Sequence, residues 1–410
     1  MGSAPAGTDR PAHRDGNVLR WLGAYTSSMI GDNVYYLALS WAAVQAGTPS
    51  QAGLVMAVSA VPRALLMLGG GVVADRFGPR KVVIGSDAVR CAAVLAVAAL
   101  LFATDPGLWP LALLAVVFGT VDAVFMPAVG ALPARVTGHG QLARVQGMRG
   151  LAIRFANVVG APLGGLAVAL GGSATAFGLA GLLIAVSVPL LISVRMRELP
   201  ADDKAAERTA WRDLRDGLGY IRRHRVLAPL IAAIALGDFG FVGPLNVGLT
   251  LLTDQRGWGA AGMGWVVAGF GTGAGAAALL LTVRGHLPHA GRVAGVAILG
   301  GSVAIGALAY APSVAAAVGV ALLVGLLAGL SGALCGALLQ THADPAYLGR
   351  VTAVAGLASL GLAPLSMPVA AAAIGWWGTG PVFVASAAVC GLGGVLALCV
   401  RDLRRAELPR

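Results

Sequence analysis

Five ionisable residues fall inside long apolar stretches of the chain, and they are the first candidates for chemistry. They are Asp32, Arg63, Asp122, Arg154 and Asp238. A charged side chain inside a lipid bilayer is costly, so a residue of this kind is by default a candidate for handling protons or substrate. An aspartate there can carry a proton, because burial favours its neutral form. The alternative for each carboxylate is a permanent structural ion pair.

The depth of two of these residues allows them to meet. Asp32 and Arg63 each lie about 18 Å into their apolar stretches, at about 1.5 Å of helix rise per residue. A contact between them would favour the ionised aspartate, while burial would favour the neutral form. Arg154 or Asp122 could substitute as the partner, and the sequence does not choose among them. Asp32 is therefore the first candidate for the proton carrier, with Arg63 as the expected regulator.

Polar side chains share helical faces with two of the carboxylates. Tyr25 and Tyr36 stand seven residues before and four residues after Asp32, and Asn246 follows Asp238 by two turns. Residues at these spacings lie on one side of a helix. In contrast, Asp87 and Arg90 are one turn apart near a predicted helix end, and their pairing is expected to be structural.

The elements that position these residues are membrane-spanning helices. Of the 410 residues, 57% are hydrophobic and only 11% are charged, against about 25% charged in ordinary soluble proteins. This composition excludes a soluble, secreted or disordered chain and a nucleic-acid-binding protein. Apolar stretches of about 20 residues match the thickness of a bilayer. Twelve spans are predicted, near 19–46, 51–73, 82–103, 108–131, 143–169, 173–194, 227–252, 259–282, 292–310, 313–339, 348–375 and 379–400.

The basic residues indicate how these spans are oriented. Of the 29 Lys and Arg residues, 24 lie in the termini and loops on one side of the predicted spans, and Arg256 lies in a loop on the opposite side. The other four, Arg63, Arg90, Arg149 and Arg154, fall inside the spans. This asymmetry is typical of the cytoplasmic side of a membrane protein. We expect both termini to be cytoplasmic, in a multi-pass protein of the bacterial cytoplasmic membrane.

The chain divides into two related halves. We expect a cytoplasmic tail at 1–18, six helices at 19–194, a cytoplasmic linker with an amphipathic helix at 195–226, six helices at 227–400 and a cytoplasmic tail at 401–410. The sequence IGD at 30–32 matches LGD at 236–238, and LARV at 142–145 matches LGRV at 348–351, both with an offset of 206. Arg76 and Arg284 also occupy corresponding positions in the two halves, with an offset of 208. Parallel repeats with a site at their interface are typical of transporters.

The loop after the second span carries the most specific motif. Residues 71–81 read GVVADRFGPRK. With its glycine, aspartate and basic residues in this order between two spans, the loop resembles the signature of the major facilitator superfamily. The resemblance implies a gate formed by Gly71, Asp75, Arg76, Gly78, Arg80 and Lys81. The alternative is a basic loop that only sets topology. The copy in the second half keeps Arg284 but lacks the aspartate.

The fifth span carries a second motif. Residues 160–165 read GAPLGG and resemble the antiporter signature of the superfamily, with the proline one residue late. The candidate residues are Gly160, Pro162, Gly164 and Gly165. The alternative is a packing kink alone. The surroundings of Asp32, Asp87 and Asp216 resemble the bacterial drug and siderophore exporter branch, which includes the macrolide-efflux and enterobactin-exporter types.

This resemblance implies an all-α membrane protein of twelve helices in two pseudo-symmetric six-helix bundles, the major facilitator fold. In that fold spans 1, 4 and 7 line a central cavity, so the resemblance places Asp32, Asp122 and Asp238 at its wall. Their neighbours Tyr25, Tyr36 and Asn246 then become candidates for the substrate cavity.

The function implied is export of a small amphipathic organic molecule, such as a drug, antibiotic or siderophore, by proton antiport with alternating access. The partners expected are that molecule, protons and membrane lipids, with no nucleic acid, and the protein is expected to be a monomer. No nucleotide motif or metal-ligand spacing is present in the sequence, so we expect no cofactor, no metal and no catalytic residues. One alternative is a proton-coupled or facilitative importer of a small metabolite. A different class of alternative is a membrane-embedded receptor or enzyme.

Overall fold

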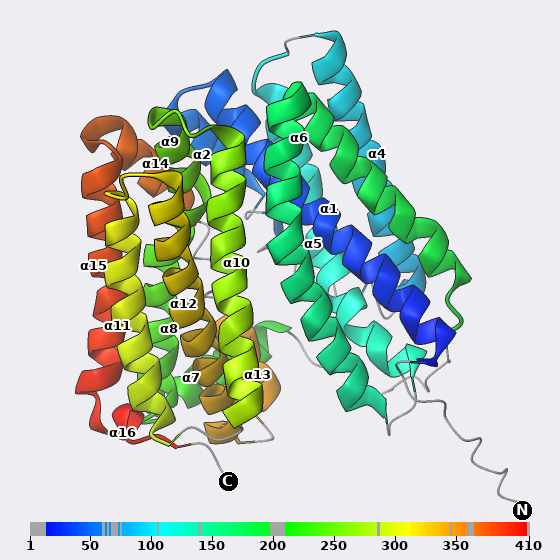
Figure 1. The fold of residues 1–410 in the computed structure, drawn as a ribbon. Coiled ribbons are helices and arrows are strands. Elements are labelled where there is room, and N and C mark those ends of the chain that lie inside the picture. The colour runs from blue at the N-terminus through cyan, green and yellow to red at the C-terminus, as the bar shows by residue number, and fades with distance from the viewer. Residues whose placement is uncertain are drawn as a thin grey trace, which may run out of the picture.

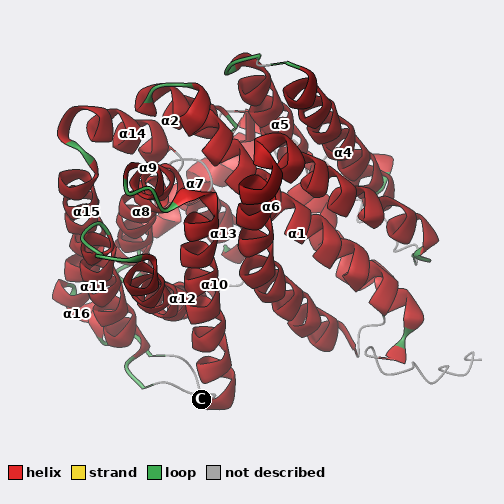
Figure 2. Cartoon of the chain, turned by 45° about the horizontal axis from the view of Figure 1, so that its top comes forward, coloured by secondary structure: helices red, strands yellow, loops and turns green. Residues whose placement is uncertain are grey.

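The structure is a computed structural model, and its regular elements are helices throughout the part of the chain that it describes (Figure 2). The described residues are 14–59, 62–63, 65–66, 73, 76–104, 106–137, 141–196, 210–284, 288–344, 347–357, 359 and 365–407. Eight helical segments among them are long and apolar enough to cross a membrane. The chain is therefore a polytopic helical membrane protein.

In the described part of the first half, five helices are assigned. They are α1 (Gly16–Ala46), α2 (Pro49–Val58), α4 (Pro79–Ala103), α5 (Trp109–Val136) and α6 (Leu142–Ser193). Local sequence explains where the first two begin. The Asp15 side chain accepts a hydrogen bond from the Asn17 amide at 2.8 Å, and Thr48 forms a reciprocal capping box with Gln51 at the start of α2. Such caps satisfy amides that have no partner within the helix.

The second half supplies the remaining elements. They are α7 (Ala210–Arg223), α8 (Leu227–Gly243), the π-helical turn η4 (Pro244–Gly248), α9 (Leu249–Gln255), α10 (Gly259–Arg284), α11 (Ala290–Leu308), α12 (Val314–His342), α13 (Leu348–Gly356), α14 (Ser366–Trp377), α15 (Thr379–Cys399) and α16 (Arg401–Arg404). The helix α7 covers the segment in which the sequence predicts an amphipathic linker helix.

Helix α6 contains two of the predicted spans, 143–169 and 173–194. The break between them is limited to Gly171 and Gly172, and Gly172 has a φ of +74°. This left-handed conformation favours glycine because it lacks a Cβ atom. The two limbs of α6 are thus joined by a turn of only two residues, which is visible as the bend between the teal and green limbs in Figure 1.

One predicted span contains an irregular turn, and a second is described only in part. The span predicted at 227–252 is built from α8, η4 and α9, so it has a π-helical turn at its centre. The span predicted at 348–375 contains α13 and α14. The residues between those two helices lie largely outside the described part of the chain. A turn such as η4 is tolerated at membrane depth where the backbone is buried in protein or lines a cavity.

Helices of each half pack mainly against one another. In the first half α6 packs against α1 and α4, and α5 packs against α4. In the second half α10 packs against α12, and α11 packs against α12 and α15. Figure 1 shows these two groups side by side, approaching one another at the top and diverging toward the end with the labelled termini.

Contacts between the halves run along α6 and α10, where Gly165 approaches Ala260 and Gly271 approaches Asn157. Further contacts lie at one end of the molecule, which we call the closed end. Here Gln45 donates a hydrogen bond to Asp254 at 2.8 Å, and the hydroxyls of Ser40 and Thr250 are hydrogen-bonded. Gly53 on α2 allows a close approach to α14, because a Cβ there would lie 2.3 Å from the Ala371 side chain. Small residues give helices in membranes this kind of close packing.

Candidate functional site

The centre of the first half holds a buried cluster around Arg90, a residue of α4 that is fully excluded from solvent. Its Nη1 atom donates to both oxygens of Asp32 on α1, at 3.1 and 2.9 Å. Its Nη2 atom donates to Asp87, and also to Ser28 at 3.3 Å. The guanidinium also lies 4.0 Å from the centroid of the Phe125 ring. Arginine is suited to such a site, because its planar guanidinium can donate several hydrogen bonds and also form a cation–π contact.

A second ion pair lies beside this cluster. The Nη2 atom of Arg63 is 2.7 Å from an Asp122 carboxylate oxygen and 2.8 Å from the Tyr36 hydroxyl. The Tyr36 hydroxyl also donates to Asp122 at 3.2 Å. The other Asp122 oxygen is 3.6 Å from Nη1 of Arg90, which joins the two groups into one network.

The network contains more carboxylates than guanidiniums. Among the described residues, Asp32, Asp87 and Asp122 lie within ion-pair distance of two arginines, Arg63 and Arg90. With all five side chains ionised, the network would carry a net charge of −1 in a low-dielectric environment. An uncompensated buried charge is strongly unfavourable. A proton bound to one of the carboxylates would neutralise the network, so this site is suited to taking up and releasing a proton.

The partners differ from those the sequence suggested. The contact expected between Asp32 and Arg63 is not formed in this conformation: Arg90 pairs with Asp32, and Arg63 pairs with Asp122. The physical reason is that the long Arg90 side chain reaches from α4 to α1 and occupies the space between them. The prediction that Asp87 and Arg90 pair is confirmed, but the pair lies inside the network and is not a separate structural bridge.

The network forms one wall of a small cavity of about 230 Å³. Of the residues singled out from the sequence, Asp32, Tyr36, Arg63 and Asp122 line it together. Their side chains come from α1, α5 and the segment that follows α2. The small cavity thus has two carboxylates of the network, Asp32 and Asp122, in its wall.

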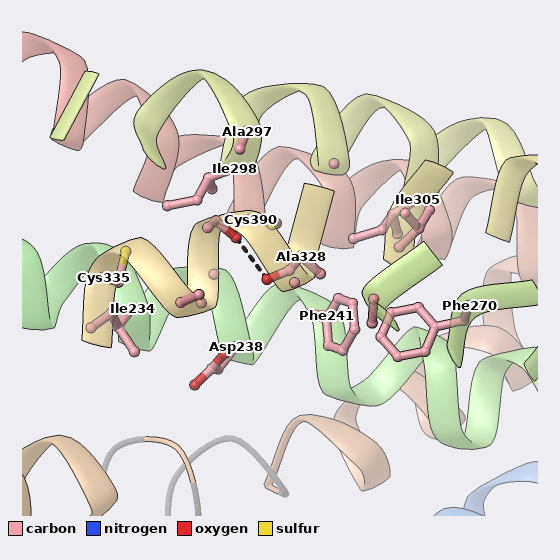
Figure 3. A pocket seen from close by; sticks show the side chains of 18 of the residues that line it. Ile234, Asp238, Phe241, Phe270, Ala297, Ile298, Ile305, Ala328, Cys335 and Cys390 are labelled. Atoms are coloured by element: carbon pink, nitrogen blue, oxygen red, sulfur yellow. Dashed lines mark hydrogen bonds between the residues drawn. The ribbon is translucent and has the colours of Figure 1, made fainter. Parts of the chain in front are cut away.

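A larger cavity of about 520 Å³ lies in the second half, and it contains Asp238 (Figure 3). The Ser359 hydroxyl donates to the Asp238 carboxylate. Figure 3 shows Phe241, Phe270 and Ile305 on one side of this cavity, with Asp238 at its edge. Arg154, on α6 of the first half, completes the lining.

Asn157 connects the two cavities, because it lines both. Its side-chain oxygen accepts a hydrogen bond from Asn33 on α1 at 3.2 Å. The sequence analysis did not predict Asn157 as a site residue. It follows Arg154 by three residues, close to one helical turn, and so lies on the same side of α6. An uncharged polar residue at this spacing from a candidate arginine was the available signal.

Two predicted cavity residues lie elsewhere. Tyr25 lines neither cavity; its ring stacks on Trp21 at 5.9 Å and lies under the Arg149 guanidinium at 5.1 Å. The reason is depth, since seven residues of helix place Tyr25 about 10 Å from Asp32 along the axis. Asn246 also lines neither cavity, and its amide donates to the Val242 carbonyl at 2.8 Å. Its position in the π-helical turn changes the direction in which the side chain points.

The predicted gating loop is described in part. Gly71 and Asp75 lie outside the described residues. Gly78 has a φ of +83° at the start of α4, a conformation that favours glycine. Arg80 donates to the Ile192 carbonyl at 2.5 Å, which satisfies a carbonyl at the end of α6.

The outer members of this loop differ in their contacts. The Arg76 guanidinium lies 5.8 Å from the centroid of the Phe77 ring. Lys81 is exposed at the start of α4. The described part of the loop thus ties α4 to α6 through Arg80, while the role of the whole loop as a gate stays a prediction.

The antiporter-like motif lies where α6 meets both halves. A Cβ at Gly160 would lie 2.6 Å from the Asn33 side chain, and one at Gly164 would lie 3.3 Å from the Val34 Cα, so these glycines admit α1. A Cβ at Gly165 would lie 2.5 Å from the Ala260 carbonyl oxygen, so this glycine admits α10 of the second half. Pro162 faces the same helix, because a Cβ at Gly264 would lie 3.3 Å from its Cα.

The described residues were also compared with the requirements of a metal site. Over the residues with assigned positions, no group of three or more His, Cys, Asp or Glu side chains is placed to hold a metal ion.

The family model of the Major Facilitator Superfamily matches residues 21–359. The chain belongs to this superfamily of transporters. Curated relatives include the enterobactin exporter EntS of Shigella boydii and of Escherichia coli O157:H7. Each is 26% identical over 362 residues, which cover 87% of this chain and 84% of the relative.

Solved structures share the fold at low sequence identity. A mutant of the nucleoside transporter NupG matches with a TM-score of 0.74 at 12% identity, covering 94% of this chain and all of the other. A D-xylose–proton symporter matches with a TM-score of 0.68 at 14% identity, and covers 96% of this chain and 98% of the other. An auto-inhibited peptide transporter of the POT family matches with a TM-score of 0.72 at 15% identity, with the same coverage. These similarities show the fold alone.

Proposed function

We propose that this protein is a proton-coupled exporter of small amphipathic organic molecules in the bacterial cytoplasmic membrane. The observation that carries the proposal is the buried network of three carboxylates and two guanidiniums beside a cavity. Its excess negative charge provides a place for one proton at membrane depth. The similarity to enterobactin exporters supports the direction of transport.

The arrangement proposed is twelve spans in two six-helix bundles, with both termini in the cytoplasm and the protein acting as a monomer. The closed end then faces the outside. The described contacts between halves at that end, such as the Gln45–Asp254 hydrogen bond, support a conformation that is open to the cytoplasm. In alternating access, these contacts would break while the opposite ends of the halves close.

Coupling would work through competition. Substrate in the larger cavity and a proton on Asp32 or Asp122 would favour different conformations of α1 and α6, which share the Asn33–Asn157 hydrogen bond. A proton moving down a membrane potential of about 100 mV supplies roughly 2.3 kcal/mol. The predicted gating loop and the motif at 160–165 would control the rearrangement of α4 and α6.

The test is transport in everted membrane vesicles that contain the protein, with rhodamine B as the fluorescent amphipathic probe. An exporter should move the dye into vesicles that are acidified inside, and a proton uncoupler should abolish the accumulation. Vesicles without the protein measure passive entry of the dye. Accumulation only in right-side-out vesicles would favour the alternative, an importer, and accumulation that ignores the uncoupler would contradict proton coupling.

A further inference from the structure

Two opposite charges face the larger cavity without a counter-ion. Arg154 enters it from α6 and Asp238 from α8. Within the described part of the chain, neither side chain forms an ion pair; Asp238 accepts a hydrogen bond from Ser359. Both side chains are half-buried. Since the two do not bridge to each other, each has capacity to bind a group of opposite charge.

The first half shows how the same protein treats buried charges that have partners within the protein. There Arg63 and Arg90 each have a carboxylate at hydrogen-bond distance. An isolated charge at membrane depth is expensive and marks a functional position. Arg154 and Asp238 have no ion-pair partner among the described residues, which indicates that a bound ligand supplies the groups of opposite charge.

The space between the charges suits an apolar body. The cavity volume of about 520 Å³ falls within the usual range for small-molecule sites, about 300–1,000 Å³. Phe241 and Phe270 face it with ring centroids 5.6 Å apart. Ile298 and Ile305 extend the apolar wall (Figure 3).

We infer that the larger cavity takes a zwitterionic amphipathic molecule, with its cationic group at Asp238, its anionic group at Arg154 and its apolar or aromatic body against Phe241 and Phe270. The inference rests on the proposed function, in which this cavity holds the transported molecule. Because Arg154 and Asp238 belong to different halves, such a ligand contacts both halves at once. A ligand with one charge would satisfy only one of the two residues.

Three related dyes test the charge preference in the wild-type protein. Rhodamine B is a zwitterion, its ethyl ester is a cation, and fluorescein is an anion. Binding is measured by fluorescence anisotropy with the purified protein in lipid nanodiscs, and empty nanodiscs correct for partition into lipid. Rhodamine B should bind at least about tenfold more tightly than either other dye, because each lacks one charge contact.

Two variants assign the charges to the residues. Asp238→Asn should remove the preference for rhodamine B over fluorescein, and Arg154→Gln should remove the preference for rhodamine B over its ethyl ester. Asp402→Asn and Arg401→Gln, on the exposed helix α16, are the matched controls and should keep both preferences.

The outcomes separate this inference from the proposed function. A wild-type preference below about tenfold, or one that survives in both cavity variants, would overturn the inference even if transport in vesicles responds to the uncoupler. A charge preference that behaves as expected would uphold the inference even if vesicle transport showed no proton dependence. The wild-type comparison needs no variant, so poor folding of a variant leaves the test intact.

Discussion

The two halves of the molecule are related by an internal repeat, but they differ in how they hold their buried charges. In the first half, Asp32 lies in a network in which arginines contact every carboxylate. In the second half, the repeat-related Asp238 lies at the edge of a cavity and accepts a hydrogen bond from a serine. The comparison shows that a repeated helical framework can hold a buried ionic network in one half and a largely apolar cavity in the other.

The repeat offsets show how the difference arises. At offsets of 208 and 206, Arg90 and Asp122 correspond to Ile298 and Ala328, and both of these residues line the larger cavity. Where the first half places a guanidinium and a carboxylate, the second half places an aliphatic side chain and a methyl group. The loss of the ionic side chains leaves both the space and the apolar wall for a ligand.

The largest expected effect comes from removing the cation that holds the first network together. Arg90→Met should destabilise the protein by about 3–5 kcal/mol, because it leaves buried carboxylates without their partner. The repeat-related control Ile298→Val should cost only about 0.5–1.5 kcal/mol. Thermal unfolding in nanodiscs compares the two variants. Equal midpoints for both would show that the halves do not differ in the way described.

Removing the excess carboxylate should affect energy coupling more than folding. Asp32→Asn leaves two carboxylates facing two guanidiniums, so the network no longer needs a proton to be neutral. The variant should lose a dye gradient of roughly 50-fold, the ratio that one proton and about 100 mV can support, but keep downhill exchange. Vesicle accumulation and exchange measure both properties, with Asp402→Asn as the control. If the variant still concentrates dye, Asp122 is the better candidate for the carrier.

A smaller effect is expected where the halves touch. The Cβ of Gly165→Ala would lie 2.5 Å from the backbone oxygen of Ala260, so the closed end cannot form without movement. An overpacking cost of about 1–3 kcal/mol corresponds to roughly a 5- to 150-fold shift in population, with tenfold near 1.4 kcal/mol. Gly178→Ala is the matched control on the same helix, since no atom lies within 4 Å of its Cβ position.

The readout is crosslinking between cysteines introduced at Gln45 and Asp254, in a background that lacks the exposed Cys399. The Gly165→Ala variant should crosslink about tenfold less than its parent, while the control should match the parent. Unchanged crosslinking in both variants would mean that Gly165 is not needed for the closed end.

The smallest effect concerns a group outside the membrane. His224 Nδ1 accepts hydrogen bonds from the amides of Val226 and Leu227, both at 3.2 Å, at the start of α8. Burial, and then the nearby His342, lower the pKa of His224. The unfolded chain therefore binds the proton more readily, so the cap is present at neutral pH and is lost as the pH falls below the ordinary histidine pKa of about 6.5 and through the lowered pKa of His224.

Hydrogen exchange of the Val226 and Leu227 amides should rise a few-fold between pH 7 and pH 5, after correction for intrinsic rates, because the loss of one cap costs about 1 kcal/mol. Exchange at the start of α11, which His289 precedes without a side-chain cap, serves as the reference. A protection that does not change with pH would exclude His224 as a pH-dependent cap.

The sequence predicted the charged residues of the site better than their contacts. Asp32, Asp122 and Asp238 are recognisable because charges are rare in apolar spans, and each lines a cavity. Their partners were not predictable, since an arginine side chain reaches over several helical positions and spacing along one helix does not set the contacts of another. The lining role of Asn157 depends on the rotation of α6 relative to α10, which packing determines.

The helical plan was similarly predictable only in outline. Apolar length locates the helices that cross the membrane, and the amphipathic pattern locates α7. The π-helical turn at 244–248 and the turn confined to Gly171 and Gly172 depend on tertiary packing. These local departures explain why Asn246 misses the cavities and why two predicted spans form one bent element.

The short turn in α6 gives this element the properties of a lever. Its first limb contacts α10 through Gly165, close to the turn, and its second limb ends near Ile192, whose carbonyl accepts a hydrogen bond from Arg80. The second limb runs for about 30 Å at about 1.5 Å per residue. A tilt of roughly 10° about the turn would displace its far end by about 5 Å. A small rearrangement beside the second half is thereby amplified into a large displacement at the opposite face of the membrane.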